Sequence, residues 1–168
     1  MPLLRWMFPA LMLVMAVPAG SAAAETGHIT GRASVMDGDT IEIHGQRIRL
    51  TGIDAIESQQ RCMLGGGIWA CGRQSAFALA GHIGTAPILC RSDGRDRYGR
   101  LLAVCFKGAE DINRWMVSQG WAVAYRRYSL AYAGAEAEAK TNRRGIWAGS
   151  FEMPWEWRKR VRQAGSGS

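Results

Sequence analysis

Apolar and β-branched residues gather in short segments separated by polar turns along the first part of the chain. Three such segments follow one another at 28–36, 40–43 and 47–53, and they predict a three-stranded meander. Two more, at 87–90 and 101–106, predict a fourth and a fifth strand joined by a polar connection.

Helical spacing appears between and after these strands. Apolar residues recur at i, i+3, i+4 and i+7 within 72–82 and predict a first helix there. Asp111 is a good N-cap for a second helix, and Gly120 is a typical C-terminal residue for it. A third helix is predicted over 130–142. The mixture of elements predicts an α+β fold that is mainly β.

The first 24 residues have the pattern of a secretory signal peptide. Arg5 provides a positive start, 6–17 is an apolar run, and small residues up to Ala24 suit cleavage after that position. An uncleaved membrane anchor is the less favoured alternative, because a spanning helix needs roughly 20 apolar residues. We therefore expect an exported protein, in the periplasm or the medium, without stable membrane association after cleavage.

The remaining chain is basic and long enough for one domain, which we place at 25–162 with a flexible tail at 163–168. The net charge of +7 becomes +6 when the leader, which carries only Arg5, is removed. Such an excess favours a polyanionic partner, and most of it is arginine, which binds phosphate bidentately. We expect a monomer.

Four cysteines lie in the mature part, and an even number in an exported chain indicates disulfides. Of the three possible pairings we favour Cys62 with Cys71, which closes a glycine-rich loop, and Cys90 with Cys105, which links two strands. Structural zinc is disfavoured, because the sequence has no Cys-x-x-Cys pair and its histidines are scattered.

Five charged residues lie within or beside the predicted strands and suit cleavage of a phosphodiester. They are Asp39, Arg49, Asp54, Glu57 and Arg100. Carboxylates hold hard cations, and guanidinium groups bind phosphate. Two carboxylates with a backbone carbonyl and waters suit Ca²⁺, whereas the twelve-residue pattern of an EF-hand is absent from the sequence.

Four segments together resemble the staphylococcal (micrococcal) nuclease family, also called thermonuclease. They are VMDGDT at 35–40, the spacing of Arg49, Asp54 and Glu57, DRYGR at 96–100, and GIW at 145–147. The resemblance implies an OB-fold, a five-stranded Greek-key barrel with about three packed helices. It also implies a Ca²⁺-dependent endonuclease that cuts DNA and RNA and leaves 3′-phosphate and 5′-hydroxyl ends.

The resemblance also implies a role for each matching residue. Asp39 and Asp54 would be direct calcium ligands, together with the carbonyl oxygen of Ala55. Arg49 and Arg100 would bind the scissile phosphate and stabilise the charge of its transition state.

Glu57 would orient the attacking water, either as its general base or as an organiser of metal-bound water, since the reference pKa of glutamate, about 4.3, is low for a base. Arg97 and Tyr98 would contact the nucleotide. The tyrosine that packs on the base is assigned to Tyr125, with Tyr128 as the alternative.

Two features depart from the family pattern. The usual threonine and proline before the glutamate are Ala55 and Ile56 here, and the lost proline loosens the expected constraint on Glu57. The insert at 58–71 either shapes substrate access or staples a long loop through its cysteines, and we favour the staple.

Two alternatives concern binding. An OB-fold could serve as a non-catalytic nucleic-acid-binding module, but this chain keeps the acids and arginines of an enzyme. Trp155 and Trp157 lie beside a basic run and could stack on bases, although we expect them to pack on the barrel.

Overall fold

The computed structural model describes residues 27–166, so the predicted signal peptide at 1–24 lies outside the described residues. Within that range, no helix combines the length and the apolar character needed to cross a bilayer.

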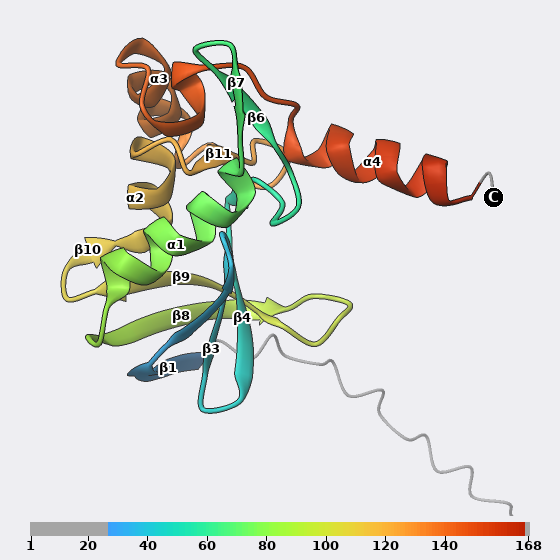
Figure 1. Ribbon diagram of the computed structural model, residues 1–168. Helices are drawn as coiled ribbons and strands as arrows, with labels where there is room; N and C mark the ends of the chain where they lie inside the picture. Colours follow the sequence, from blue (N-terminus) through green and yellow to red (C-terminus); the bar gives the residue numbers. More distant parts are fainter. Residues whose placement is uncertain (1–26, 167–168) are drawn as a thin grey trace, which may run out of the picture.

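The main sheet is curled, and both of its ends come from one stretch of chain (Figure 1). The strand order is β1-β8-β9-β4-β3-β2, with β10 paired to β9. β4 and β9 are parallel, and the other neighbours are antiparallel. Because β1 and β2 are separated only by Ala33, the two edges of the sheet must approach each other. The strands are β1 Gly27–Arg32, β2 Ser34–Asp37, β3 Thr40–Ile43, β4 Gln46–Leu50, β8 Pro87–Arg95, β9 Leu101–Lys107 and β10 Glu110–Asp111.

The predicted strand at 47–53 is split in two. β4 ends at Leu50, Gly52 turns with φ +76°, and β5 (Ile53–Ala55) pairs with β11 (Ala122–Ala124) instead of the main sheet. Glycine is needed at this turn because of the positive φ and because an added Cβ would lie 2.8 Å from the Tyr132 ring. A further hairpin joins β6 (Cys62–Leu64) to β7 (Gly67–Trp69) within the insert.

Three helices lie near their predicted positions, at α1 Cys71–Ile83, α2 Ile112–Ser118 and α3 Ala133–Thr141. Asp111 caps α2 as expected, because its carboxylate accepts the Arg114 N–H at 2.9 Å. A short 3₁₀ helix follows at η1 Gly145–Ala148.

α4 (Pro154–Gly165) is a fourth helix that the sequence analysis did not predict. It begins with proline at its first turn, where the missing N–H costs nothing, and it includes the first three residues of the segment assigned to a tail. Figure 1 shows α4 and the β8–β9 hairpin projecting on the same side of the molecule.

The main core fills the curl of the sheet beneath α1 and α2. It includes fully buried residues from alternate positions of β3 and β4, such as Ile41, Ile43 and Ile48, with Leu79 from α1 and Ile112 from α2. A disulfide joins Cys90 and Cys105, which face each other across β8 and β9.

A smaller second core lies beside it and holds the start of α4. It consists of the buried residues Ile56, Cys62, Cys71, Val123 and Ile146, with Trp69, Trp147, Phe151, Met153 and Trp155 packed against them. The Cys62–Cys71 disulfide ties β6 to the start of α1 here, so both disulfides follow the pairing favoured from the sequence. The β6–β7 hairpin also pairs with the segment before α4, through Met63 and Ser150.

Glu136 of α3 stabilises β11 from a buried position. Its carboxylate accepts the Ala124 N–H at 3.1 Å and contacts Arg126 at 2.7 Å and Lys140 at 2.9 Å. Burial raises the pKa of Glu136, but the hydrogen bonds from Lys140, Ala124 and Arg126 outweigh it, so the pKa is lowered overall.

We expect Glu136→Gln to lower the free energy of unfolding by about 1–3 kcal/mol at neutral pH, because a buried charged hydrogen-bond network is lost. The lowered pKa means that the ionised carboxylate stabilises the fold above the ordinary value of 4.5, and that this contribution disappears as the pH falls through the lowered pKa. Urea titrations at neutral and acidic pH measure both effects. Glu138→Gln is the control, since that exposed residue pairs only with Arg144; an equal loss in both variants contradicts the prediction.

Candidate active site

The turn between β2 and β3 brings Asp39 against β5. Asp37 accepts the Asp39 N–H at 3.0 Å, so Asp37 shapes the turn. Gly38 lets the turn approach closely, because an added Cβ would lie 2.7 Å from the Ala55 Cβ and would also collide with Ser75. Asp39 Oδ2 then accepts the Ala55 N–H at 2.8 Å, which fixes the carboxylate beside β5.

Arg49 of β4 lies between the two predicted calcium aspartates. Its Nη2 is 3.0 Å from Asp54 Oδ1, and its Nη1 forms an ion pair with Asp39. The Asp54 side chain is fully buried. Burial lowers the pKa of Arg49 and the nearby Arg100 adds to this effect, while Asp54 opposes it. One guanidinium group therefore bridges both carboxylates.

Arg158 of α4 reaches the same carboxylates and was not foreseen as a site residue. Its Nη1 and Nη2 lie 3.0 and 2.7 Å from the two oxygens of Asp54, and its Nη1 is 2.6 Å from Glu57 Oε1. Burial lowers the pKa of Arg158, but the hydrogen bonds to Asp54 and Glu57 outweigh it and raise the pKa overall. The guanidinium group stays charged and holds two acids together.

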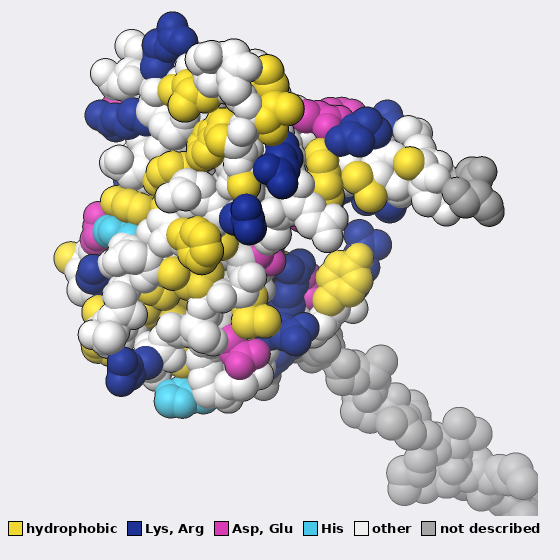
Figure 2. All heavy atoms as spheres, viewed as in Figure 1, with side chains coloured by type: hydrophobic (Ala, Val, Ile, Leu, Met, Phe, Trp, Pro, Cys, Tyr) yellow, Lys and Arg dark blue, Asp and Glu magenta, His cyan; other side chains and the backbone are white. Residues whose placement is uncertain are grey.

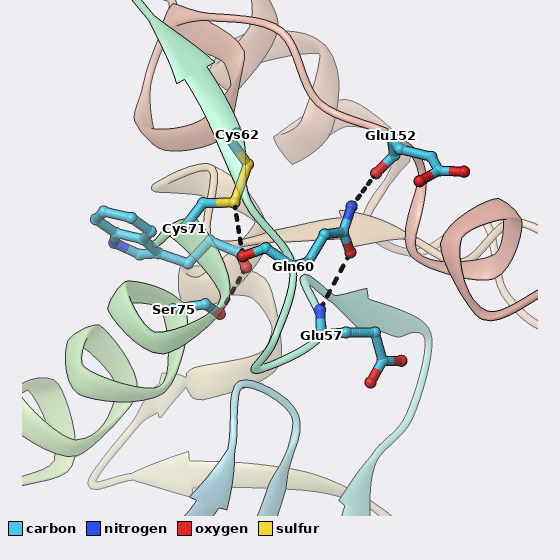
Figure 3. The surroundings of a disulfide bond; sticks show 7 residues. Glu57, Gln60, Cys62, Cys71, Ser75 and Glu152 are labelled. Carbon is cyan, nitrogen blue, oxygen red and sulfur yellow. Dashed lines mark hydrogen bonds between the residues drawn. A yellow bond between two sulfur atoms is a disulfide. The ribbon is translucent and has the colours of Figure 1, made fainter. Parts of the chain in front are cut away.

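Glu57 is held in place through contacts made by its own backbone N–H and carbonyl groups (Figure 3). Gln60 is buried, accepts the Glu57 N–H at 3.3 Å through its side-chain oxygen, and donates to the Glu152 carbonyl before α4. At the start of α1, an added Cβ on Gly72 would lie 2.6 Å from the Glu57 carbonyl carbon, so only glycine allows this approach. These contacts constrain the loop, in which Ile56 stands where the family usually has proline.

Arg100 is held at the start of β9 by the turn of the β8–β9 hairpin. Its Nε and Nη2 both lie 2.8 Å from Asp96 Oδ2, and its Nη1 is 3.4 Å from Thr40 Oγ1. Burial raises the pKa of Asp96, but hydrogen bonds from Arg100 and the Tyr98 amide outweigh it and lower the pKa overall. Tyr98 is exposed, with the Arg97 guanidinium 5.4 Å from its ring centroid.

Aromatic rings from the segment after β11 and from α4 also border the site. Tyr125 stacks on Trp155 of α4, with ring centroids 5.8 Å apart, and meets the exposed Tyr128 edge-on at 5.0 Å. One face of Tyr125 is therefore covered by Trp155, as expected if this tryptophan packs on the domain.

These groups surround one cleft of about 1100 Å³. Figure 2 shows basic and acidic side chains together in the hollow between α4 and the β8–β9 hairpin. The buried Asp54 is not itself one of the lining residues. No described residue of the insert at 58–71 lines the cleft either. The predicted site residues in its lining are Asp39, Arg49, Ala55, Glu57, Arg97, Tyr98, Arg100 and Tyr125.

The donor chemistry of the site fits a hard cation. Over residues 27–166, no group of three or more His, Cys, Asp or Glu side chains is arranged as a ready metal site. Asp39 and Asp54 nevertheless contact the same Arg49 guanidinium, so their carboxylates are close enough for one cationic group to bridge them. Such a cation would have to replace contacts that Arg49 and Arg158 now make.

Sequence reasoning missed two residues of the site, Arg158 and Gln60. The spacing of Trp155, Arg158 and Arg162 after Pro154 is a helical signal that could have revealed α4. Gln60 has no comparable signal, because its role depends on contacts with Glu57 and with a segment 92 residues away.

Comparisons with known proteins identify the family of this chain. The family model described as "Staphylococcal nuclease homologue" matches residues 47–149, which leaves α4 outside the matched span. "Succinoglycan biosynthesis protein ExoI" of Rhizobium meliloti is 42% identical over 80% of this chain and 71% of its own length. "Micrococcal nuclease" of Shigella flexneri is 31% identical over 96% and 95%, and "Protein ParB" of Escherichia coli is 32% identical over 89% and 88%. With the curled sheet and the cleft that gathers its acids and arginines, the chain belongs to the staphylococcal nuclease family.

Proposed function

We propose that this protein is an exported, calcium-dependent endonuclease that hydrolyses DNA and RNA and leaves 3′-phosphate and 5′-hydroxyl ends. One observation carries the proposal: Asp39, Arg49, Glu57 and Arg100, from separate parts of the chain, line one cleft with Asp54 directly behind them. Acids for a cation and arginines for a phosphate therefore lie within reach of one phosphodiester group.

Calcium would be held by the carboxylates of Asp39 and Asp54 and by the carbonyl oxygen of Ala55. These are oxygen ligands, which Ca²⁺ prefers, and few protein ligands leave room for substrate phosphate and water. A bound cation there would act as a Lewis acid on a phosphate oxygen.

Arg49 and Arg100 would bind the scissile phosphate. Both now contact carboxylates, Arg49 those of Asp39 and Asp54 and Arg100 that of Asp96. A phosphate in the cleft would offer oxygens to the same nitrogens, and donors already held at the site need little reorganisation. Glu57 would orient the attacking water, as its general base or as an organiser.

Export is consistent with the two disulfides, which form and persist in oxidising compartments. The leader at 1–24 would direct the chain to the periplasm or the medium, where the mature domain at 25–162 would act as a monomer.

The proposal is tested with the purified mature protein, denatured DNA and RNA, and either calcium or a chelator. We expect cleavage of both polymers only with calcium, and end-group analysis should find 3′-phosphates and 5′-hydroxyls. Cleavage in chelator or 5′-phosphate ends would overturn the mechanism. Binding without any cleavage would instead support a non-catalytic binding module.

We expect Glu57→Gln to lower kcat by about 10²–10⁴ at saturating calcium, because aligned proton transfer or water positioning is lost. The measurement is initial cleavage rate against substrate concentration. Glu156→Gln is the matched control, since Glu156 is exposed on α4 and does not line the cleft. Turnover of Glu57→Gln near the wild-type value would remove Glu57 from the mechanism.

We expect Arg158→Gln to bind calcium several-fold more tightly in titration calorimetry without nucleic acid, because Arg158 now occupies both oxygens of Asp54. Arg160→Gln is the control: it removes an equal charge from α4, but that arginine pairs with Glu152. Weaker calcium binding by Arg158→Gln would mean that Arg158 arranges the acids for the cation instead of competing with it.

A further inference from the structure

α4 contributes a face to the cleft that lies outside the residues matched by the family model. Trp155, Arg158 and Arg162 line the cleft, and their spacing of three and then four residues places them on one side of the helix. Lys159 and Arg160 lie on α4 as well but do not line the cleft. The helix thus presents one aromatic ring and two guanidinium groups toward the site.

The base of α4 is held in place by contacts that do not depend on Arg158. Trp155 packs on the second core and stacks on Tyr125 at 5.8 Å. Gln60 binds the Glu152 carbonyl, and Met63 pairs with Ser150 just before the helix. The start of this face is therefore held against the domain.

The charges on α4 are only partly neutralised. Arg158 pairs with Asp54 and Glu57, and Arg160 pairs with Glu152. Among the described residues, Arg162 has no acidic partner within ion-pairing distance, and it lies one helical turn beyond Arg158, roughly 6 Å further along the axis. Arg127, from the loop after β11, also lines the cleft without an acidic partner in the described part of the chain.

We propose that the α4 face and Arg127 form a binding site for the nucleic-acid strand next to the scissile phosphate. Arg162 and Arg127 contact backbone phosphates, and the Trp155–Tyr125 stack with Tyr128 forms an aromatic surface for a base. Cationic groups beside aromatic rings are the usual platform for single strands, because every base has a π-face and every nucleotide a phosphate. When a cation takes the oxygens of Asp54, Arg158 joins the same row of phosphate donors.

The inference rests on the proposed function, because it extends the substrate site of that nuclease. It adds a requirement that the nuclease proposal lacks: affinity must depend on strand length, since Arg162 is reached only by nucleotides beyond the cleavage point.

The test compares Arg162→Gln with Lys159→Gln, which removes the same charge from the same helix at a residue that does not line the cleft. Fluorescence anisotropy in chelator, where no cleavage is expected, measures binding of a thymidine dinucleotide, whose one internucleotide phosphate would occupy the cleavage site, and of an oligothymidylate of about 12 nucleotides, a length within the range that OB-folds cover. We expect Arg162→Gln to weaken binding of the longer strand several-fold, with little change for the dinucleotide. Lys159→Gln should bind both nearly as the wild type does.

The salt dependence gives a second readout. We expect Arg162→Gln to reduce the slope of log affinity against log salt for the longer strand by about 0.7, the value for one lost phosphate contact on a single strand. Equal losses in Arg162→Gln and Lys159→Gln, or an equal loss for short and long strands, would overturn the inference. Because binding is measured without cleavage, these outcomes are independent of whether the nuclease proposal holds.

Discussion

The buried carboxylate of Asp54 is the constraint on which the arrangement of the site depends. A fully buried charge is tolerated only when it is paired and hydrogen-bonded, and here Arg49 and Arg158 provide both. Removing one partner of such a pair typically costs about 3–5 kcal/mol. The need to neutralise one side chain therefore ties α4 to β4 and β5, although Arg158 and Asp54 are 104 residues apart in the sequence.

Under the proposed function, this pairing would allow the arginines to change partners. Guanidinium groups that now contact carboxylates would move to phosphate oxygens when a cation takes their place on the acids, and they would remain charged throughout. Their present contacts would then hold them near the substrate position before the substrate binds. The insert contributes indirectly, because the β6–β7 hairpin and the Cys62–Cys71 disulfide help form the second core beneath α4.

Local signals predicted much of the fold. The strand at 40–43 and the Asp111 cap were correct, because periodicity and capping depend on neighbouring residues. The break at Gly52 was missed, since an isolated glycine in a strand pattern does not reveal that the next strand changes partner. α4 was missed because its tryptophans and arginines were interpreted as a packed aromatic segment and a basic run.

The sequence by itself determined which side chains are candidates for the chemistry, because Asp39, Arg49, Glu57 and Arg100 stand in short motifs whose spacing is a local property of the chain. Only the tertiary structure decided that Arg158 joins them. Its contact with Asp54 spans 104 residues and exists because the second core holds the start of α4 beside the acids. Packing between distant segments depends on the shapes of many side chains at once, so no local sequence pattern predicts it.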